Sequence, residues 1–237
     1  MNYIMLVAGR GSRLQPLTND MPKSLFHLDR DVTIIDRMVQ IIRKYDPTGK
    51  IILVTGFMHE MIEKTLKDQE IIFIHNPYYA VTNSIASLWF AQEYMTGETV
   101  IINGDIVIDD YIAKEILCRK PIESVVLIDT SIKSDGDYNI RLHHDKIVVM
   151  SKALSEYDGE YAGVSILTAN DVHSLRTTVN EMVDGGYYDQ WYENALVQMI
   201  FNKNFTLKYI DLCNYQWTEV DSVNDLLLAK KIHESSH

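Results

Sequence analysis

Short runs of purely apolar residues, separated by segments with helical patterns, constrain the fold of this chain more than any other feature. Four such runs occupy residues 3–7, 51–54, 71–74 and 100–102. Strands that are apolar on both faces are typical of a parallel sheet that is covered by helices on both sides. We therefore expect an α/β fold, with a Rossmann-like, mostly parallel sheet and helices on both of its faces.

The segments between these runs carry signals for helices. Thr33 is a typical N-cap residue with Asp36 at the third helical position, and an apolar stripe follows at helical spacing. A second helix is expected around residues 58–66. A third is expected from an N-cap at Asn83 to about Met95.

The pattern changes after residue 123. Further strands are expected at 124–128, 146–150, 161–167 and 207–210, and residues 131–138 are rich in turn formers. These strands should either extend the sheet or form a small β-rich lobe. The last predicted helix begins at Ser222. Since no repeat, low-complexity segment or clear linker is visible, we expect one domain over residues 1–237.

The charge balance limits the possible partners. Lys and Arg total 22 against 33 Asp and Glu, which gives a net charge of −11. Such a surface repels nucleic acid and anionic membranes, so neither is an expected partner. Any site for a phosphorylated ligand must therefore gather its few cations locally. The first apolar run is too short for a signal peptide or a membrane span. The two cysteines, Cys118 and Cys213, are far apart in the sequence, as is usual for reduced thiols in a protein core. We therefore expect a cytoplasmic protein.

A glycine-containing loop follows the first predicted strand. Gly9 and Gly11 allow backbone N–H groups to approach a phosphate without obstruction from a Cβ atom, although many such pairs are only tight turns. A dinucleotide-binding fingerprint needs a third glycine where this chain has Leu14, and the Gly-Lys-Ser/Thr of a P-loop is absent. Two cations, Arg13 and Lys23, lie ten residues apart in this loop and could both face a triphosphate.

This loop resembles the signature of a known superfamily. Residues 6–18 are LVAGRGSRLQPLT and residues 21–25 are MPKSL, and the pattern G-x-G-x-R-x-x-P-L-T followed by P-K is that of the sugar-nucleotidyltransferases. The resemblance implies the nucleotide-diphospho-sugar transferase-like fold, with residues 1–110 binding a nucleotide and residues 111–237 forming the acceptor-binding half. It also implies catalytic roles for Arg13 and Lys23. The implied nucleotide-binding residues are Leu6, Ala8, Gly9, Gly11, Ser12 and Gly104.

Two carboxylates are candidates for metal binding. Asp105 ends a predicted strand as part of Gly104-Asp105, and Asp221 precedes the last predicted helix. Mg²⁺ prefers oxygen ligands and needs only one or two carboxylates besides the phosphates of a substrate. A turn residue at Asp105 and a helix N-terminal acid at Asp221 are the structural alternatives. The resemblance implies that both residues bind Mg²⁺.

Residues 76–88, NPYYAVTNSIASL, are similar to the branch of this superfamily that uses CTP with phosphocholine, 2-aminoethylphosphonate and related acceptors. The resemblance implies that Asn83 and Ser84 contact the nucleotide, and Asn83 can cap a helix at the same time. The length of the chain also matches this branch, without the C-terminal β-helix of larger relatives.

The acceptor site is expected in the second half of the chain. Lys152 follows a predicted strand, at the place where the superfamily has a lysine that contacts the acceptor phosphate. An exposed lysine is the alternative. Aromatic faces and carboxylates attract ammonium groups, although aromatic residues can equally pack in the core. The candidates are Tyr138, Tyr188, Asp189, Trp191, Tyr192 and Glu193, with Tyr161 as a weaker one.

The expected activity is therefore transfer of CMP from CTP to a small phosphate or phosphonate with release of pyrophosphate. Phosphocholine, an amine and an amino-acid derivative all remain open as acceptors. The alternatives are a nucleotidyltransferase for a sugar or polyol phosphate, using CTP, UTP or dTTP, and a non-catalytic nucleotide-binding regulator. Homodimers are common in the superfamily, and the residues leave the oligomeric state open.

Overall fold

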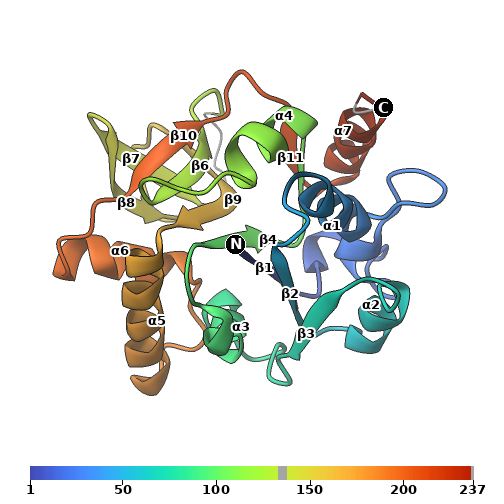
Figure 1. The fold of residues 1–237 in the computed structure, drawn as a ribbon, viewed down its shortest axis with the longest axis horizontal. Helices are drawn as coiled ribbons and strands as arrows, with labels where there is room; N and C mark the ends of the chain where they lie inside the picture. Colours follow the sequence, from blue (N-terminus) through green and yellow to red (C-terminus); the bar gives the residue numbers. More distant parts are fainter. Residues whose placement is uncertain (133–137, 236–237) are drawn as a thin grey trace.

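A central mixed sheet organises the computed structural model, which describes residues 1–132 and 138–235 (Figure 1). Within these residues the sheet has nine strands. Seven of them follow the spatial order β10-β6-β9-β4-β1-β2-β3, β7 also pairs with β9, and β8 pairs with β7. The turn-rich segment expected at 131–138 falls largely on residues 133–137, which lie outside the described residues. No helix among the described residues is long and apolar enough to cross a membrane.

The first half of the chain forms the parallel part of the sheet. β4 pairs with β1, β1 with β2 and β2 with β3, all in parallel register, so the predicted alternation of strands and helices is confirmed. The elements are β1 (Asn2–Val7), α1 (Ile34–Tyr45), β2 (Lys50–Thr55), α2 (His59–Thr65), β3 (Ile71–His75), α3 (Ser84–Phe90) and β4 (Thr99–Asn103).

Alternate residues of β1 enter two separate cores. Tyr3 and Met5 pack with α1 and α2 on one face, whereas Ile4 packs with α3 on the other. Because both faces are covered, the central strands can be apolar throughout. Helix α1 begins as predicted, with a reciprocal capping box between Thr33 and Asp36. Helix α3 is shorter than predicted, since it ends at Phe90 and a 3₁₀ turn (Gln92–Tyr94) follows.

The second half extends the same sheet through an antiparallel strand. β9 (Gly159–Leu167) pairs antiparallel with both β4 and β6 (Val125–Asp129), and β10 (Lys208–Asp211) pairs parallel with β6. The hairpin of β7 (Asn139–His143) and β8 (Lys146–Ser151) attaches to β9 at the end of the molecule remote from β3 (Figure 1). The strands of this half therefore both extend the sheet and form a small β-rich lobe.

Two helices of the second half cover the same face as α3. These are α5 (Ala169–Asp184) and α6 (Glu193–Asn202), whose buried residues share one core with α3. Behind the other face lie the short helix α4 (Asp110–Ile112) and the π-helical turn Ala113–Leu117.

A small antiparallel ribbon brings the end of the chain back to the centre. β5 (Ile106–Ile108) pairs with β11 (Trp217–Glu219), and α7 (Val223–Glu234) follows β11. The backbone N–H of Val220 donates to the carbonyl oxygen of Asp105 at 3.0 Å. Residue 221 is therefore held beside residue 105. Ser222, where the last helix was expected to begin, is the N-cap of α7 and forms a capping box with Asp225.

Candidate active site

A pocket opens at the carboxyl ends of β1 and β4, the edge at which parallel α/β sheets bind ligands. All of the residues expected to bind the nucleotide line it: Leu6, Ala8, Gly9, Gly11, Ser12, Asn83, Ser84 and Gly104. Arg13, Lys23, Asp105 and Asp221 also line it. The fold therefore gathers these residues in one place, while their roles stay predictions.

Glycine is required at two positions of the pocket wall. Gly11 has φ +62°, a left-handed conformation that other residues adopt only with strain, and its carbonyl oxygen accepts from Thr18 Oγ1 at 2.8 Å. A Cβ atom at Gly104 would lie 2.3 Å from Val7 Cγ1 and 2.8 Å from the carbonyl oxygen of Leu6. The end of β4 can therefore lie against β1 only because residue 104 has no side chain.

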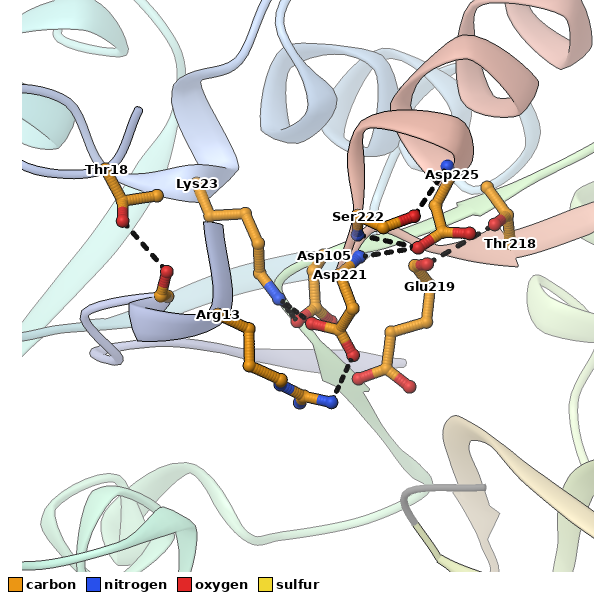
Figure 2. Close-up of polar contacts among 10 residues, drawn as sticks. Arg13, Thr18, Lys23, Asp105, Thr218, Glu219, Asp221, Ser222 and Asp225 are labelled. Carbon is orange, nitrogen blue, oxygen red and sulfur yellow. Dashed lines mark hydrogen bonds and ion pairs between the residues drawn. The ribbon is translucent and has the colours of Figure 1, made fainter. Parts of the chain in front are cut away.

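Two cations from the loop lie against carboxylates that follow β4 and β11, two strands distant in sequence (Figure 2). Lys23 Nζ lies 2.6 Å from Asp105 Oδ2 and 2.6 Å from Asp221 Oδ1. Arg13 Nη1 lies 2.8 Å from Asp221 Oδ2. The site thus gathers two cations of the acidic chain beside the glycine loop, where both are paired with carboxylates.

Burial affects the charges of this group. Burial alone would lower the pKa of Lys23, but the charges of Asp105 and Asp221 outweigh it and raise that pKa, so the ammonium stays charged. The pKa of Asp221 is raised, because the effect of burial and of the nearby Asp105 charge exceeds the opposing effect of Lys23 and Arg13.

A third carboxylate joins the two that were predicted. Oxygen atoms of Asp105, Glu219 and Asp221 all lie within 4.8 Å of one another. Glu219 was not predicted as a candidate ligand because β11 was not predicted. Residues 219 and 221 are two apart at the end of this strand, which places their side chains on the same side. Asp105 Oδ1 is buried and has no hydrogen-bond partner among the described residues. Three hard oxygen donors, one of them unpartnered, suit Mg²⁺.

Polar side chains from the loop after β3 and from α3 also line the pocket. Asn83 Oδ1 accepts from the backbone N–H of Ser84 at 2.8 Å, so Asn83 caps α3 as expected. Asn76, Tyr79, Thr82, Ser87, Ser24 and Asn103 also line the pocket and were not singled out from the sequence. Asn76 Nδ2 donates to Ser87 Oγ at 3.1 Å, which ties the loop after β3 to α3. Most of these residues fall in the segment 76–88, whose resemblance to cytidylyltransferases was the available signal.

The residues expected to bind the acceptor do not surround one cavity. Only Trp191 lines the pocket, and Lys152 Nζ lies 4.1 Å from the centroid of its ring. Tyr188 and Asp189 are exposed, whereas Tyr138 and Tyr192 are buried. The hydroxyls of Tyr161 and Tyr192 bond to each other and to Ser165 Oγ, and the hydroxyl of Tyr138 donates to Asn194 Oδ1. Tyr161 is buried as well, so all three tyrosines pack in the core, and a role for them at an acceptor stays a prediction.

Glu193 is a buried carboxyl group behind the pocket wall. Its exposed fraction is 1%, and burial raises its pKa to about 8, although the Asn103 amide and the Lys152 charge act in the opposite direction. Its Oε2 atom has no hydrogen-bond partner among the described residues. Burial also raises the pKa of Tyr161 and of Tyr192, so their hydroxyls stay protonated. Glu193 thus lies beside Lys152 and Asn103 rather than in the open pocket.

Comparison with known proteins identifies the family of the chain. The model of the nucleotidyl transferase family matches residues 2–130, which is more than half of the chain and includes the glycine loop, Lys23 and Asp105. The chain belongs to the nucleotidyl transferase family. It is a nucleotidyltransferase, as the resemblance of its glycine loop predicted.

Relatives and solved structures agree with this assignment. A choline-phosphate cytidylyltransferase of Haemophilus influenzae is 27% identical over 76% of this chain and 75% of its own length. A CTP:phosphoglutamine cytidylyltransferase of Campylobacter jejuni is 23% identical over 95% of this chain and 98% of its own. The structure of the CTP:phosphocholine cytidylyltransferase of Streptococcus pneumoniae superposes with a TM-score of 0.79 at 19% identity, covering 98% of each chain. The expected fold is confirmed.

Proposed function

We propose that this nucleotidyltransferase transfers CMP from CTP to a phosphate or phosphonate oxygen of a small, amine-bearing metabolite and releases pyrophosphate. The observation that carries the proposal is the group of Arg13, Lys23, Asp105 and Asp221 at the end of a pocket formed by the glycine loop. Three relatives that span most of the chain are named as choline-phosphate or CTP:phosphoglutamine cytidylyltransferases, which supports CTP as the donor.

The reaction is a direct displacement at the α-phosphorus. An acceptor oxygen forms a bond to this phosphorus, and the bond to the oxygen that bridges the α- and β-phosphates breaks, so the electron pair leaves with pyrophosphate. The main obstacle is the approach of an anionic acceptor to a triphosphate of like charge. Catalysis therefore depends on positioning and on neutralisation of charge.

The cations of the site are suited to this task. We assign Arg13 to the β- and γ-phosphates and to the leaving pyrophosphate, and Lys23 to the α-phosphate and the incoming acceptor oxygen. Lys152, held against Trp191, would bind the remaining acceptor oxygens. Residues 1–110 would thus bind the nucleotide, and residues 111–237 the acceptor.

Mg²⁺ is the metal that suits the three carboxylates. Asp105 and Asp221 would hold it, with Glu219 beside them, and a bound Mg²⁺ would neutralise charge on the α-phosphate. The backbone N–H groups of the glycine loop and the guanidinium of Arg13 would orient the phosphates.

The donor and the acceptor are tested by an assay of pyrophosphate release with Mg²⁺. CTP, UTP, dTTP and GTP are each offered with phosphocholine, 2-aminoethylphosphonate, an amino-acid phosphate, a hexose phosphate and a polyol phosphate. We expect release with CTP and an amine-bearing acceptor. Release only with UTP or dTTP and a hexose phosphate would instead establish the sugar-phosphate alternative. A cytoplasmic location stays a prediction, and the oligomeric state stays open.

A further inference from the structure

The ammonium group of Lys23 lies between the two carboxylates that were expected to bind the metal. It is 2.6 Å from an oxygen of Asp105 and 2.6 Å from an oxygen of Asp221, and 13% of its side chain is exposed (Figure 2). Glu219 is the third acid of the group, and the second oxygen of Asp221 accepts from Arg13 at 2.8 Å. A cation of the chain itself therefore neutralises this pair of carboxylates.

An ammonium group and a divalent metal compete for these oxygens. Mg²⁺ binds carboxylate oxygens at about 2.0–2.1 Å. A metal ion on Asp105 Oδ2 or Asp221 Oδ1 would thus come into direct repulsive contact with the ammonium that is bonded to these two atoms. Asp105 Oδ1 has no partner among the described residues, but both oxygens of Asp221 are paired, one with Lys23 and the other with Arg13. An ion that binds Asp221 through Oδ1 therefore requires Lys23 to move away.

Moving Lys23 requires another anion to receive it. The ammonium is largely buried, and a buried charge without a partner is strongly unfavourable. The stem of Lys23 packs against the glycine loop, since a Cβ atom on Gly11 would lie 3.2 Å from Lys23 Cβ. Rotation about this unbranched stem can carry the ammonium along the pocket that Gly9, Gly11 and Ser12 line, where the proposed phosphates would lie.

We propose that Lys23 closes the carboxylate pair to divalent metal in the nucleotide-free protein, and that the triphosphate opens it by drawing the ammonium onto its own oxygens. The metal and the nucleotide then bind together rather than one before the other. This inference rests on the proposed function, because it takes a triphosphate as the ligand that moves Lys23. It gives Lys23 a role in the order of binding in addition to its role in transfer.

The test is direct binding of Mn²⁺, measured by electron paramagnetic resonance without nucleotide or acceptor. In Lys23→Met the unbranched apolar stem is kept and the charge is lost. We expect this variant to bind one Mn²⁺ at least about tenfold more tightly than the wild type. The double variant Lys23→Met/Asp105→Asn should lose the gain, which would place the ion at this site rather than elsewhere on an acidic surface.

Thermal melting gives a second readout. Without Lys23, Asp105 and Asp221 lose a cation that both of them contact. Lys23→Met should therefore melt at a lower temperature than the wild type in EDTA and recover when Mn²⁺ or Mg²⁺ is added. The matched control is Lys44→Met, which removes a lysine paired with Asp110 at 2.5 Å outside the pocket. Its affinity for Mn²⁺ should equal that of the wild type.

Equal affinity for Mn²⁺ in Lys23→Met and the wild type would overturn the proposal. Tight binding of Mn²⁺ by the nucleotide-free wild type, with a dissociation constant well below about 1 mM, would also overturn it. This measurement does not depend on whether a variant folds. Both experiments omit nucleotide and acceptor. They can therefore succeed even if the transfer assay shows another donor or acceptor, and they can fail while CMP transfer is confirmed.

Discussion

Glu193 is buried at the start of α6, and its ionisation should make the stability of the folded chain depend on pH. Its pKa rises from 4.5 to about 8 on folding, mainly because burial disfavours the charged carboxylate. At about 1.36 kcal/mol per pKa unit, this rise corresponds to a cost on the order of 5 kcal/mol for holding the ionised group in the fold. Glu193→Gln removes the ionisation but keeps the size of the side chain and an oxygen that can accept from Asn103.

The sign of the effect follows from which state binds the proton. Below about pH 4.5 the carboxyl is protonated in both the folded and the unfolded chain, so ionisation costs nothing. Between pH 4.5 and 8 the folded chain retains the proton that the unfolded chain loses, and stability falls by about 1.4 kcal/mol per pH unit. Above pH 8 the cost is complete. Relative to the wild type, Glu193→Gln should gain about 3 kcal/mol between pH 4.5 and pH 7.

Urea unfolding of both proteins at pH 5.5, 6.5, 7.5 and 8.5 measures this difference. Groups that titrate equally in the two proteins cancel, so only the ionisation of Glu193 contributes to the pH-dependent part. The control is Glu60→Gln, an exposed residue of α2, whose difference from the wild type should stay constant. If the free energies of unfolding of wild type and Glu193→Gln run parallel with pH, burial does not hold the proton on this carboxyl and the reasoning is wrong.

Three substitutions test the pocket itself. Lys23→Ala should lower turnover in the CTP assay by on the order of 10²–10³, the scale of one preorganised charge, and near-normal turnover in a folded variant would refute its role. Asp105→Asn should abolish activity together with the response to Mg²⁺, whereas an active variant would place the metal elsewhere. Gly104→Ala puts a carbon 2.3 Å from a side chain of β1, so urea unfolding should show a loss of about 1–3 kcal/mol.

The first half of the fold could be predicted because its signals are local. Each parallel strand is a short apolar run, and the capping pair Thr33 and Asp36 marks the start of α1 within four residues. The antiparallel direction of β9 was not predictable in this way, because it depends on pairing with β4 and β6, which are distant in sequence. β5 and β11 have three residues each, too few for a periodic pattern to stand out.

The same distinction applies to the site. The loop with Arg13 and Lys23 is one continuous segment and was visible as such, but the ion pair between Lys23 and Asp221 joins residues 198 positions apart. The aromatic and acidic residues at 188–193 suggested one binding surface, yet the start of α6 buries Tyr192 and Glu193 and leaves Tyr188 exposed. Residue type alone did not separate side chains that pack in the core from those that line the pocket.

The ribbon of β5 and β11 has a consequence for biosynthesis. Asp105 leaves the ribosome with the parallel strands, but Glu219 and Asp221 follow only after the second half of the sheet, at the end of a strand that pairs with β5. Lys23 can have only one of its two carboxylate partners until then. A nascent or truncated chain that stops before β11 would contain the glycine loop and the sheet around it and still lack two of the three carboxylates, so activity should appear only after β11 has been made.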